Sequence, residues 1–313
     1  MPSPRLAEQA RNRLAEALRQ RVAGPDAAPR AAAIWLAPGE RRFAPSDPIC
    51  RVHGHAGMYA GGIRALLLQA LHPLAMAGVG QHSGYRGDPW GRLQRTSEFI
   101  AMTTYGPVDS AQRVIDRINR VHRTVRGTAT DGRRYAATDP HLLRWVHVAE
   151  IDSFLVAHQH YARTPLSPAE TDRYVDQAAW AAEELGVLDP PRTARELEES
   201  LAAYRPELEA SEGALDVARF LLAEPPLPWA ARPGFWMLAA GAVQMLPGYA
   251  RDLLGLRLPG PLRALERPAL AALDPLGRLG TAAVGWALSS PDDPRNSPQS
   301  SAVVDRTARA PHS

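Results

Sequence analysis

The chain has 313 residues, of which 45% are hydrophobic and 22% charged, a composition typical of a soluble globular protein with a substantial core. Its formal net charge of +3 comes from scattered arginines without a basic run of five or more, so we expect no nucleic-acid partner. The single cysteine, Cys50, excludes an intrachain disulfide, a four-cysteine iron–sulfur site and covalent haem attachment through Cys-x-x-Cys-His.

The N-terminal segment predicts an amphipathic helix over residues 5–22, with Leu6, Leu14 and Leu18 on its apolar face. Residues 24–29 break this helix, and residues 38–47 are expected to be irregular. Residues 1–45 are therefore interpreted as an N-terminal helical arm, 46–288 as the main helical domain, and 289–313 as a disordered tail rich in Ser, Pro, Asp and Asn. No secretory signal is evident at the N-terminus, so the cytoplasm is the expected location.

The stretch from Met58 to Gly80 is rich in Ala, Leu and Gly, and its length alone would suit a membrane span. Arg64 and His72 argue against a span, because a charge at mid-membrane depth costs at least about 2.5 kcal/mol. We predict a buried central helix that ends near Pro73, and no membrane association. Residues 48–87 contain no Asp or Glu.

The next helix is predicted from Pro89 to Thr104, with Asp88 as its N-cap and the proline in its first turn. Helical spacing places a guanidinium, two hydroxyls and an aromatic ring on one stripe of this helix: Arg92, Thr96, Phe99 and Thr103. The stripe is more polar than an ordinary core face, which marks it as a candidate functional surface.

Two histidines are predicted to point inward from the following helices. His122 falls within an apolar face of a helix over residues 109–126, and His147 lies on a stripe with His158 on a helix from Asp139 to Arg163. A buried unpaired polar group costs about 1–3 kcal/mol, so each ring needs a partner. For either ring the partner is a metal or a hydrogen-bonding group, which for His147 includes Glu150.

The remaining pattern indicates helices over 167–186, 193–210 and 213–223, followed by apolar segments at 235–246 and 253–258 that form a buried helix or a pocket wall. A hairpin over residues 126–136, with Asp131-Gly132 at its turn, is the one predicted β element. We therefore predict an all-α fold with a single large helical domain. The motifs of di-iron carboxylate proteins, zinc proteases, serine hydrolases and phosphate-binding loops are absent from the sequence.

Several blocks in fixed order, within residues 49–188, resemble the family of latex clearing protein (rubber oxygenase) and the MpaB-like oxygenases. The blocks are Gly61-Gly-Ile-Arg-Ala-Leu-Leu-Leu-Gln-Ala-Leu-His72-Pro73, Gln81-His82-Ser83, Asp88-Pro-Trp-Gly-Arg92-Leu-Gln-Arg95-Thr96, Val121-His122-Arg-Thr-Val125-Arg-Gly127, and Asp139-Pro140 with Leu143-Arg-Trp145-Val-His147.

The resemblance implies a b-type haem in a globin-like pocket between helices, held by one axial histidine. By position, His122 is the proximal iron ligand, with His147 as its rival. Arg92 and Thr96 are the distal polar residues, and Arg95 takes the basic position that is a lysine in the rubber-cleaving branch. This chain has no lysine, and because arginine is a poor metal ligand we expect an open or water-bound sixth position.

The function implied is a haem b-dependent oxygenase acting with dioxygen on a small apolar organic substrate, with oxidative cleavage of a carbon–carbon double bond as the candidate reaction. Arg92, Arg95 and Thr96 are its candidate catalytic residues. The rubber-cleaving branch of the family also uses a carboxylate on the distal side as a catalytic base. Residues 48–87 contain no such carboxylate, so rubber itself is not the expected substrate. Two alternatives stay open: a haem-binding protein without oxygenase activity, and a cofactor-free helical interaction protein. The sequence leaves substrate, reductant and oligomeric state undetermined.

Overall fold

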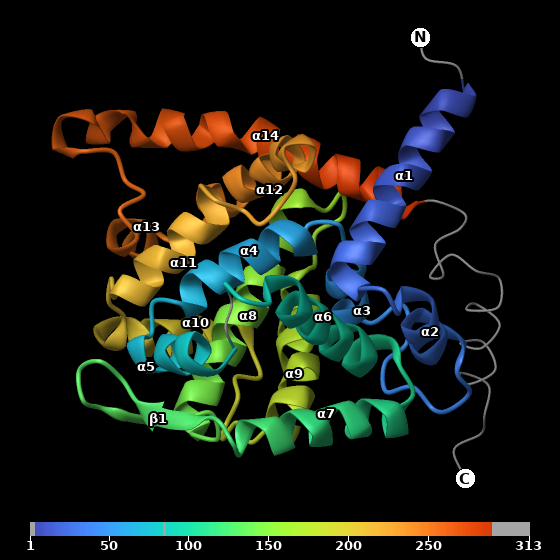
Figure 1. The fold of residues 1–313 in the computed structure, drawn as a ribbon, viewed down its shortest axis with the longest axis horizontal. Coiled ribbons are helices and arrows are strands. Elements are labelled where there is room, and N and C mark those ends of the chain that lie inside the picture. The colour runs from blue at the N-terminus through green and yellow to red at the C-terminus, as the bar shows by residue number, and fades with distance from the viewer. Residues whose placement is uncertain (1–3, 84–85, 290–313) are drawn as a thin grey trace. The chain divides into compact units, whose positions relative to one another are not determined.

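The computed structural model describes residues 4–83 and 86–289. These residues form α-helices and a single two-stranded antiparallel sheet (Figure 1), so the predicted all-α class is confirmed. The predicted disordered tail lies outside the described residues, apart from Ser289. Contacts divide the chain into two compact units: unit 1 comprises Met1–Ala56, Tyr85–Ile118 and Ala283–Ser313, and unit 2 comprises Gly57–Gly84 and Asn119–Ala282.

Unit 1 is built from α1 and α6, with α3 packed on α6. Its elements are α1 (Pro4–Ala23), α2 (Ala27–Ala31), a π-helical turn η1 (Ala32–Leu36), α3 (Pro48–Gly54), α6 (Pro89–Tyr105), α7 (Val108–His122) as far as Ile118, and the last residues of α14. The hydroxyl of Tyr105 donates to the Cys50 carbonyl at 2.9 Å, and His53 Nδ1 lies 2.8 Å from Thr104 Oγ1. These bonds fasten α3 to the C-terminal end of α6.

Unit 2 holds most of the chain. Its elements are α4 (Met58–Gln69), α5 (Pro73–Gly78), η2 (Val79–Ser83), the end of α7, β1 (Arg126–Thr128), β2 (Arg134–Ala136), α8 (Pro140–Tyr161), α9 (Pro168–Glu184), α10 (Ala194–Tyr204), η3 (Arg205–Glu207), α11 (Glu212–Leu222), η4 (Trp229–Ala231), α12 (Arg232–Met245), α13 (Gly248–Leu253), η5 (Gly260–Leu265) and α14 (Glu266–Leu288) as far as Ala282. The strands pair antiparallel, with Gly127 opposite Tyr135.

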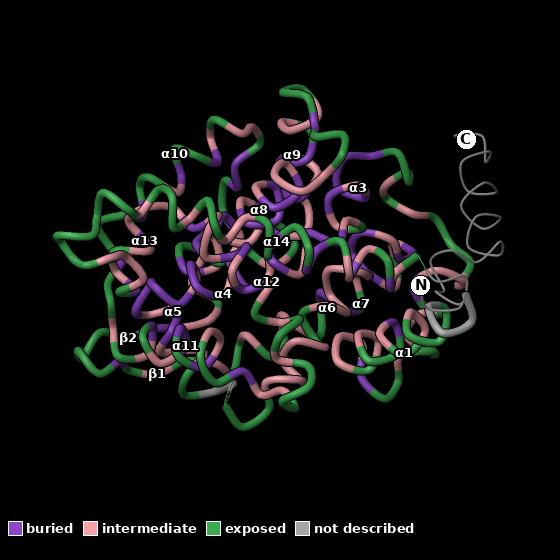
Figure 2. The backbone as a smooth tube through the Cα atoms, turned by 90° about the horizontal axis from the view of Figure 1, so that it is seen from above, coloured by how far each residue is buried: buried purple, intermediate pink, exposed green. Residues whose placement is uncertain are grey.

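The core of unit 2 is the packing of α4 against α8, which lie side by side in Figure 1. Buried positions recur along both helices (Figure 2). The backbones approach closely at Gly61, where an added Cβ would lie 3.0 Å from the Ser153 carbonyl oxygen. An added side chain would force its neighbours to move by a few tenths of an ångström, so glycine suits this close approach of the two helices.

A buried arginine joins these two helices to α12. Arg64 is 4% exposed, and its guanidinium donates to Asp152 Oδ2 at 2.7 Å, to Ser153 Oγ at 2.7 Å and to the Met245 carbonyl at 3.0 Å. A buried charge is tolerated when it is paired and its donors are satisfied, as here. The sequence analysis used Arg64 only as an argument against a membrane span; the structure gives it a packing role.

The predicted break near Pro73 is confirmed, since α4 ends at Gln69 and α5 begins at Pro73. In the described part of the chain no single helix is long and apolar enough to span a membrane. The segments Met58–Gln69 and Pro73–Gln81 meet that criterion only when taken together, across a bend of 104°.

Other predictions needed correction. The helix predicted over 109–126 ends at His122, since residues 126–128 pair in the hairpin instead, and Val121 on its predicted apolar face is 54% exposed. The helix predicted to residue 210 ends at Tyr204, because Pro206 cannot continue the backbone hydrogen bonding and η3 follows. The long helix α14, which contains Pro275, was not predicted, and most of the apolar segment 253–258 is a connection rather than a buried helix.

Candidate functional site

The candidate residues of the Arg92-x-x-Arg95-Thr96 motif lie on α6 in unit 1. Asp88 caps this helix as predicted, accepting the Gly91 N–H at 2.9 Å, and it also pairs with Arg95 at 3.2 Å. Both members of that pair are exposed, so it contributes little stability. Thr96 is exposed, whereas Arg92 is half-buried and its pKa is lowered by burial first and by the charge of Arg95 second.

Only part of the polar stripe on α6 remains a candidate for a functional role. Thr103 is buried, and its hydroxyl donates to the carbonyl of Phe99 at 2.8 Å within the same helix. A threonine bonded in this way satisfies its own hydroxyl and needs no ligand. The candidate polar groups of the stripe are therefore confined to its N-terminal part, at Arg92 and Thr96.

His122 is the last residue of α7, in the part of that helix that belongs to unit 2. The ring is half-buried, and its Nδ1 is buried without a hydrogen-bond partner among the described residues. Burial lowers the pKa of His122, which favours the neutral imidazole. The predicted inward orientation is therefore correct for Nδ1, and no described residue hydrogen-bonds to that nitrogen.

His147 lies on α8 in unit 2, and its Nε2 is likewise buried with no partner among the described residues. Burial lowers the pKa of His147 to about 4, with the charge of Arg144 as a smaller cause. One helical turn further along, burial raises the pKa of Glu150 to about 7. Burial raises the pKa of Tyr174 on α9, and the negative charge of Glu150 raises it further. Unit 2 thus holds two half-buried histidines whose pKa is lowered by burial and a half-buried carboxyl group whose pKa is raised to about 7.

The raised pKa of Glu150 predicts a stability that depends on pH. Between the unfolded value of 4.5 and the folded value of about 7, the folded protein keeps a proton that the unfolded chain has lost. Stability from this group is present below pH 4.5 and is lost as pH rises through 7. The free energy of unfolding of Glu150→Gln, measured in urea relative to that of wild type, should rise by about 2 kcal/mol from pH 5 to pH 8. The exposed Glu199→Gln is the control; an equal gain there would contradict the prediction.

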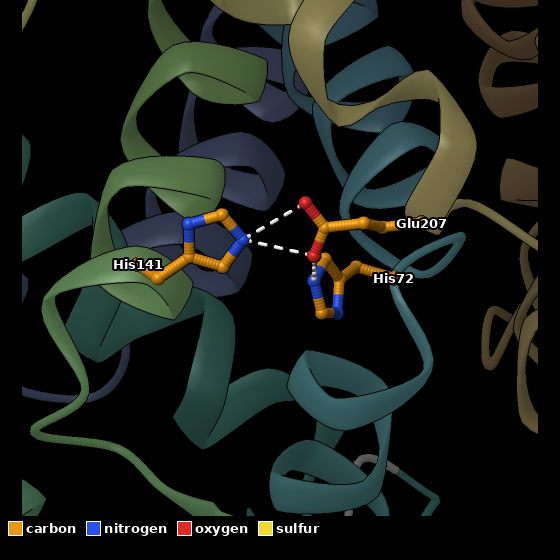
Figure 3. Close-up of side chains that lie close together, drawn as sticks. All are labelled: His72, His141 and Glu207. Atoms are coloured by element: carbon orange, nitrogen blue, oxygen red, sulfur yellow. Dashed lines mark hydrogen bonds and ion pairs between the residues drawn. The ribbon is translucent and has the colours of Figure 1, made fainter.

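A cluster that the sequence analysis did not predict brings together His72, His141 and Glu207, all in unit 2 (Figure 3). His72 precedes α5, His141 lies in the first turn of α8, and Glu207 ends η3. In Figure 3 the carboxylate lies between the two imidazoles: Oε2 is 3.3 Å from His72 Nε2 and 2.8 Å from His141 Nε2.

The cluster has one buried member and two accessible ones. The His72 side chain is 2% exposed, those of His141 and Glu207 52% and 41%. Burial lowers the pKa of His72, although the hydrogen bond to Glu207 opposes the shift. The three residues lie far apart in sequence, and no metal-binding motif joins them. The sequence analysis used His72 only within a family block and as an argument against a membrane span, and Glu207 lay in a segment interpreted as packing.

Comparison with known proteins identifies the family of this chain. The chain is an all-α protein that buries uncharged histidines. Residues 50–283, more than half of the chain, match the family model "ER-bound oxygenase mpaB/B'/Rubber oxygenase, catalytic domain", and the chain belongs to that family. It therefore has an oxygenase catalytic domain, which makes it an enzyme of the oxidoreductase class with dioxygen and a substrate as its implied partners. Neither the curated proteins nor the solved structures contain a significant match.

Proposed function

We propose that this protein is a haem b-dependent oxygenase that uses dioxygen to oxidise a small apolar organic molecule. The observation that carries the proposal is that His122 Nδ1 and His147 Nε2, both within the matched oxygenase domain, are buried without a hydrogen-bond partner among the described residues. A buried imidazole without a hydrogen-bond partner costs about 1–3 kcal/mol. Coordination to a haem iron would offset that cost, because the neutral imidazole is the form that binds metals.

We propose His122 as the residue that would hold the haem iron, because of its position in the family motif. Its Nδ1 is the buried nitrogen that has no hydrogen-bond partner among the described residues, so Nδ1 is the nitrogen that would hold the iron. His147 is the alternative ligand, with Nε2 itself orphaned. Both rings satisfy the requirement for neutrality, because burial lowers the pKa of each. The haem, when bound, would supply the oxidation chemistry itself.

Other residues are assigned roles that follow from their own chemistry. Arg92 and Thr96, proposed on the family motif, would stabilise negative charge that develops during dioxygen reduction. Arg95 is kept as the basic residue of the motif, although its pairing with Asp88 on the surface weakens the case for direct participation. Glu150, with a pKa of about 7, has the property expected of a group that holds or releases a proton near neutral pH.

Dioxygen consumption by haem-loaded protein tests the proposal. We expect uptake that depends on an apolar alkene, with ¹⁸O from labelled dioxygen appearing in carbonyl products if the double bond is cleaved. Thr96→Val should lower kcat about 10-fold or more while haem binding is unchanged, because a charge-stabilising donor is typically worth several kcal/mol in the transition state. Haem binding with no dioxygen-dependent product across a panel of alkenes would instead favour a haem protein without oxygenase activity.

A further inference from the structure

We infer that His72, His141 and Glu207 form a second metal site, separate from the proposed haem ligands, for a divalent first-row transition ion of the Zn(II) type. The three donor atoms lie within 4.8 Å of one another. Two imidazoles and one carboxylate are a donor set that proteins use for zinc with an open fourth position. The inference does not depend on haem.

Two of the three distances between donor atoms are close to those that such an ion needs, and the third is within 4.8 Å. Bonds of about 2.0–2.1 Å in a tetrahedral arrangement place neighbouring ligand atoms about 3.3 Å apart. His72 Nε2 and Glu207 Oε2 are 3.3 Å apart. His141 Nε2 lies 2.8 Å from the same oxygen, so this ring would withdraw by about 0.5 Å to admit the ion. Its side chain is half-exposed and has room to do so.

The second nitrogen of His141 also favours ligation, whereas His72 Nδ1 is buried without a hydrogen-bond partner among the described residues. The Tyr204 hydroxyl donates to the His141 carbonyl at 2.8 Å, and its oxygen lies 3.4 Å from His141 Nδ1. In a metal-free cluster His141 carries its proton on Nε2, which donates to Glu207. His141 Nδ1 then has no proton, and the Tyr204 hydroxyl that faces it already donates its own proton to the His141 carbonyl. If His141 Nε2 binds a metal, the ring proton sits on Nδ1, which can then donate to the Tyr204 hydroxyl oxygen. Metal-bound histidines are normally oriented through such a bond.

The backbone holds two of the donors in place before any ion binds. Leu71, which precedes His72, accepts a hydrogen bond at 2.9 Å from the backbone N–H of Glu209, two residues after Glu207. Asp139 caps α8 by accepting the His141 backbone N–H at 2.9 Å. Because the donors are positioned by helix ends and a backbone bond, little conformational entropy is lost on binding. The accessible faces of His141 and Glu207 leave the fourth position to water.

Isothermal titration of Zn(II) into untagged, chelator-treated protein tests the inference. We expect one tight ion per chain in wild type, and an affinity at least about 100-fold lower in His141→Ala and in Glu207→Gln. Zn(II) at 100 times its Kd should raise the Tm of wild type by about 5 °C and leave both variants unchanged. Both substituted side chains are about half-exposed, so we expect the variants to fold, which circular dichroism checks.

The matched control is His160→Ala. His160 is a half-buried histidine on α8 that bonds to Asp274, and it lies outside the cluster. This variant should bind Zn(II) as wild type does. His122→Ala should also keep the Zn(II) site, while the two cluster variants should keep haem binding, so failure of the haem proposal and failure of this inference are separable. Wild type that binds no Zn(II), or cluster variants that bind it with wild-type affinity, would overturn the inference.

Discussion

Replacing Arg64 by alanine is expected to lower the free energy of unfolding by about 3–5 kcal/mol. Asp152 would lose the cation 2.7 Å away, and Ser153 Oγ and the Met245 carbonyl would lose a donor. The cost is large because the substitution leaves the Asp152 carboxylate, only 18% exposed, without its cation, and not merely with one bond fewer. A cavity in the α4–α8 core adds to it. Urea unfolding followed by circular dichroism measures the change.

Arg95→Ala is the matched control for this prediction. Arg95 also pairs with an aspartate, Asp88, but both side chains are about 60% exposed, at 62% and 60%. Exposed pairs are worth about 0–1 kcal/mol. Double substitution of Arg64 and Asp152 by apolar residues should restore part of the lost stability, since the stranded charge is removed. Equal losses for Arg64→Ala and Arg95→Ala would show that the buried pair does not fasten α4 to α8.

Replacing His122 by alanine is expected to weaken haem binding by about 100-fold, equivalent to about 2.7 kcal/mol. The variant loses the proposed axial imidazole but none of the helix packing that a larger change would disturb, because the ring is half-buried at the end of α7. The Soret band in the visible spectrum should disappear or shift strongly. Added imidazole, which can enter the space left by the side chain, should restore much of it.

His147→Ala separates the two candidate ligands. If His122 ligates iron, His147→Ala should keep the Soret position of wild type. If the band is instead unchanged in His122→Ala and lost in His147→Ala, the axial ligand is His147. Both variants remove one partially buried imidazole of lowered pKa, so their general effects on folding are comparable and the spectra can be compared directly.

The sequence predicted best what is decided locally. Asp88, Asp139 and Ser167 were predicted to begin helices, and each side chain accepts a backbone N–H in the first turn. Such caps depend on a few adjacent residues, so their signal is present in any short window. The hairpin turn was predicted for the same reason: Gly132 has φ +86°, a conformation that glycine adopts without strain.

Features that depend on distant residues were missed. His72, His141 and Glu207 meet only because the corner between α4 and α5 packs beside the start of α8 and the end of η3, and no local pattern encodes that. The exposure of Val121 could not be predicted either, because helical period shows which residues share a face but not what covers it. Family resemblance supplied His122 as a ligand; the orphaned Nδ1 now gives a physical reason to test it.

The central claim is that the chain binds haem through a histidine, and titration of haem into wild-type protein tests it most directly. The account predicts a Soret band that saturates at one haem per chain, with the spectrum of a histidine-ligated b-type haem. A titration in which the haem spectrum stays that of the free cofactor would contradict the account. The orphaned imidazoles of His122 and His147 would then belong to a helical protein that binds no haem.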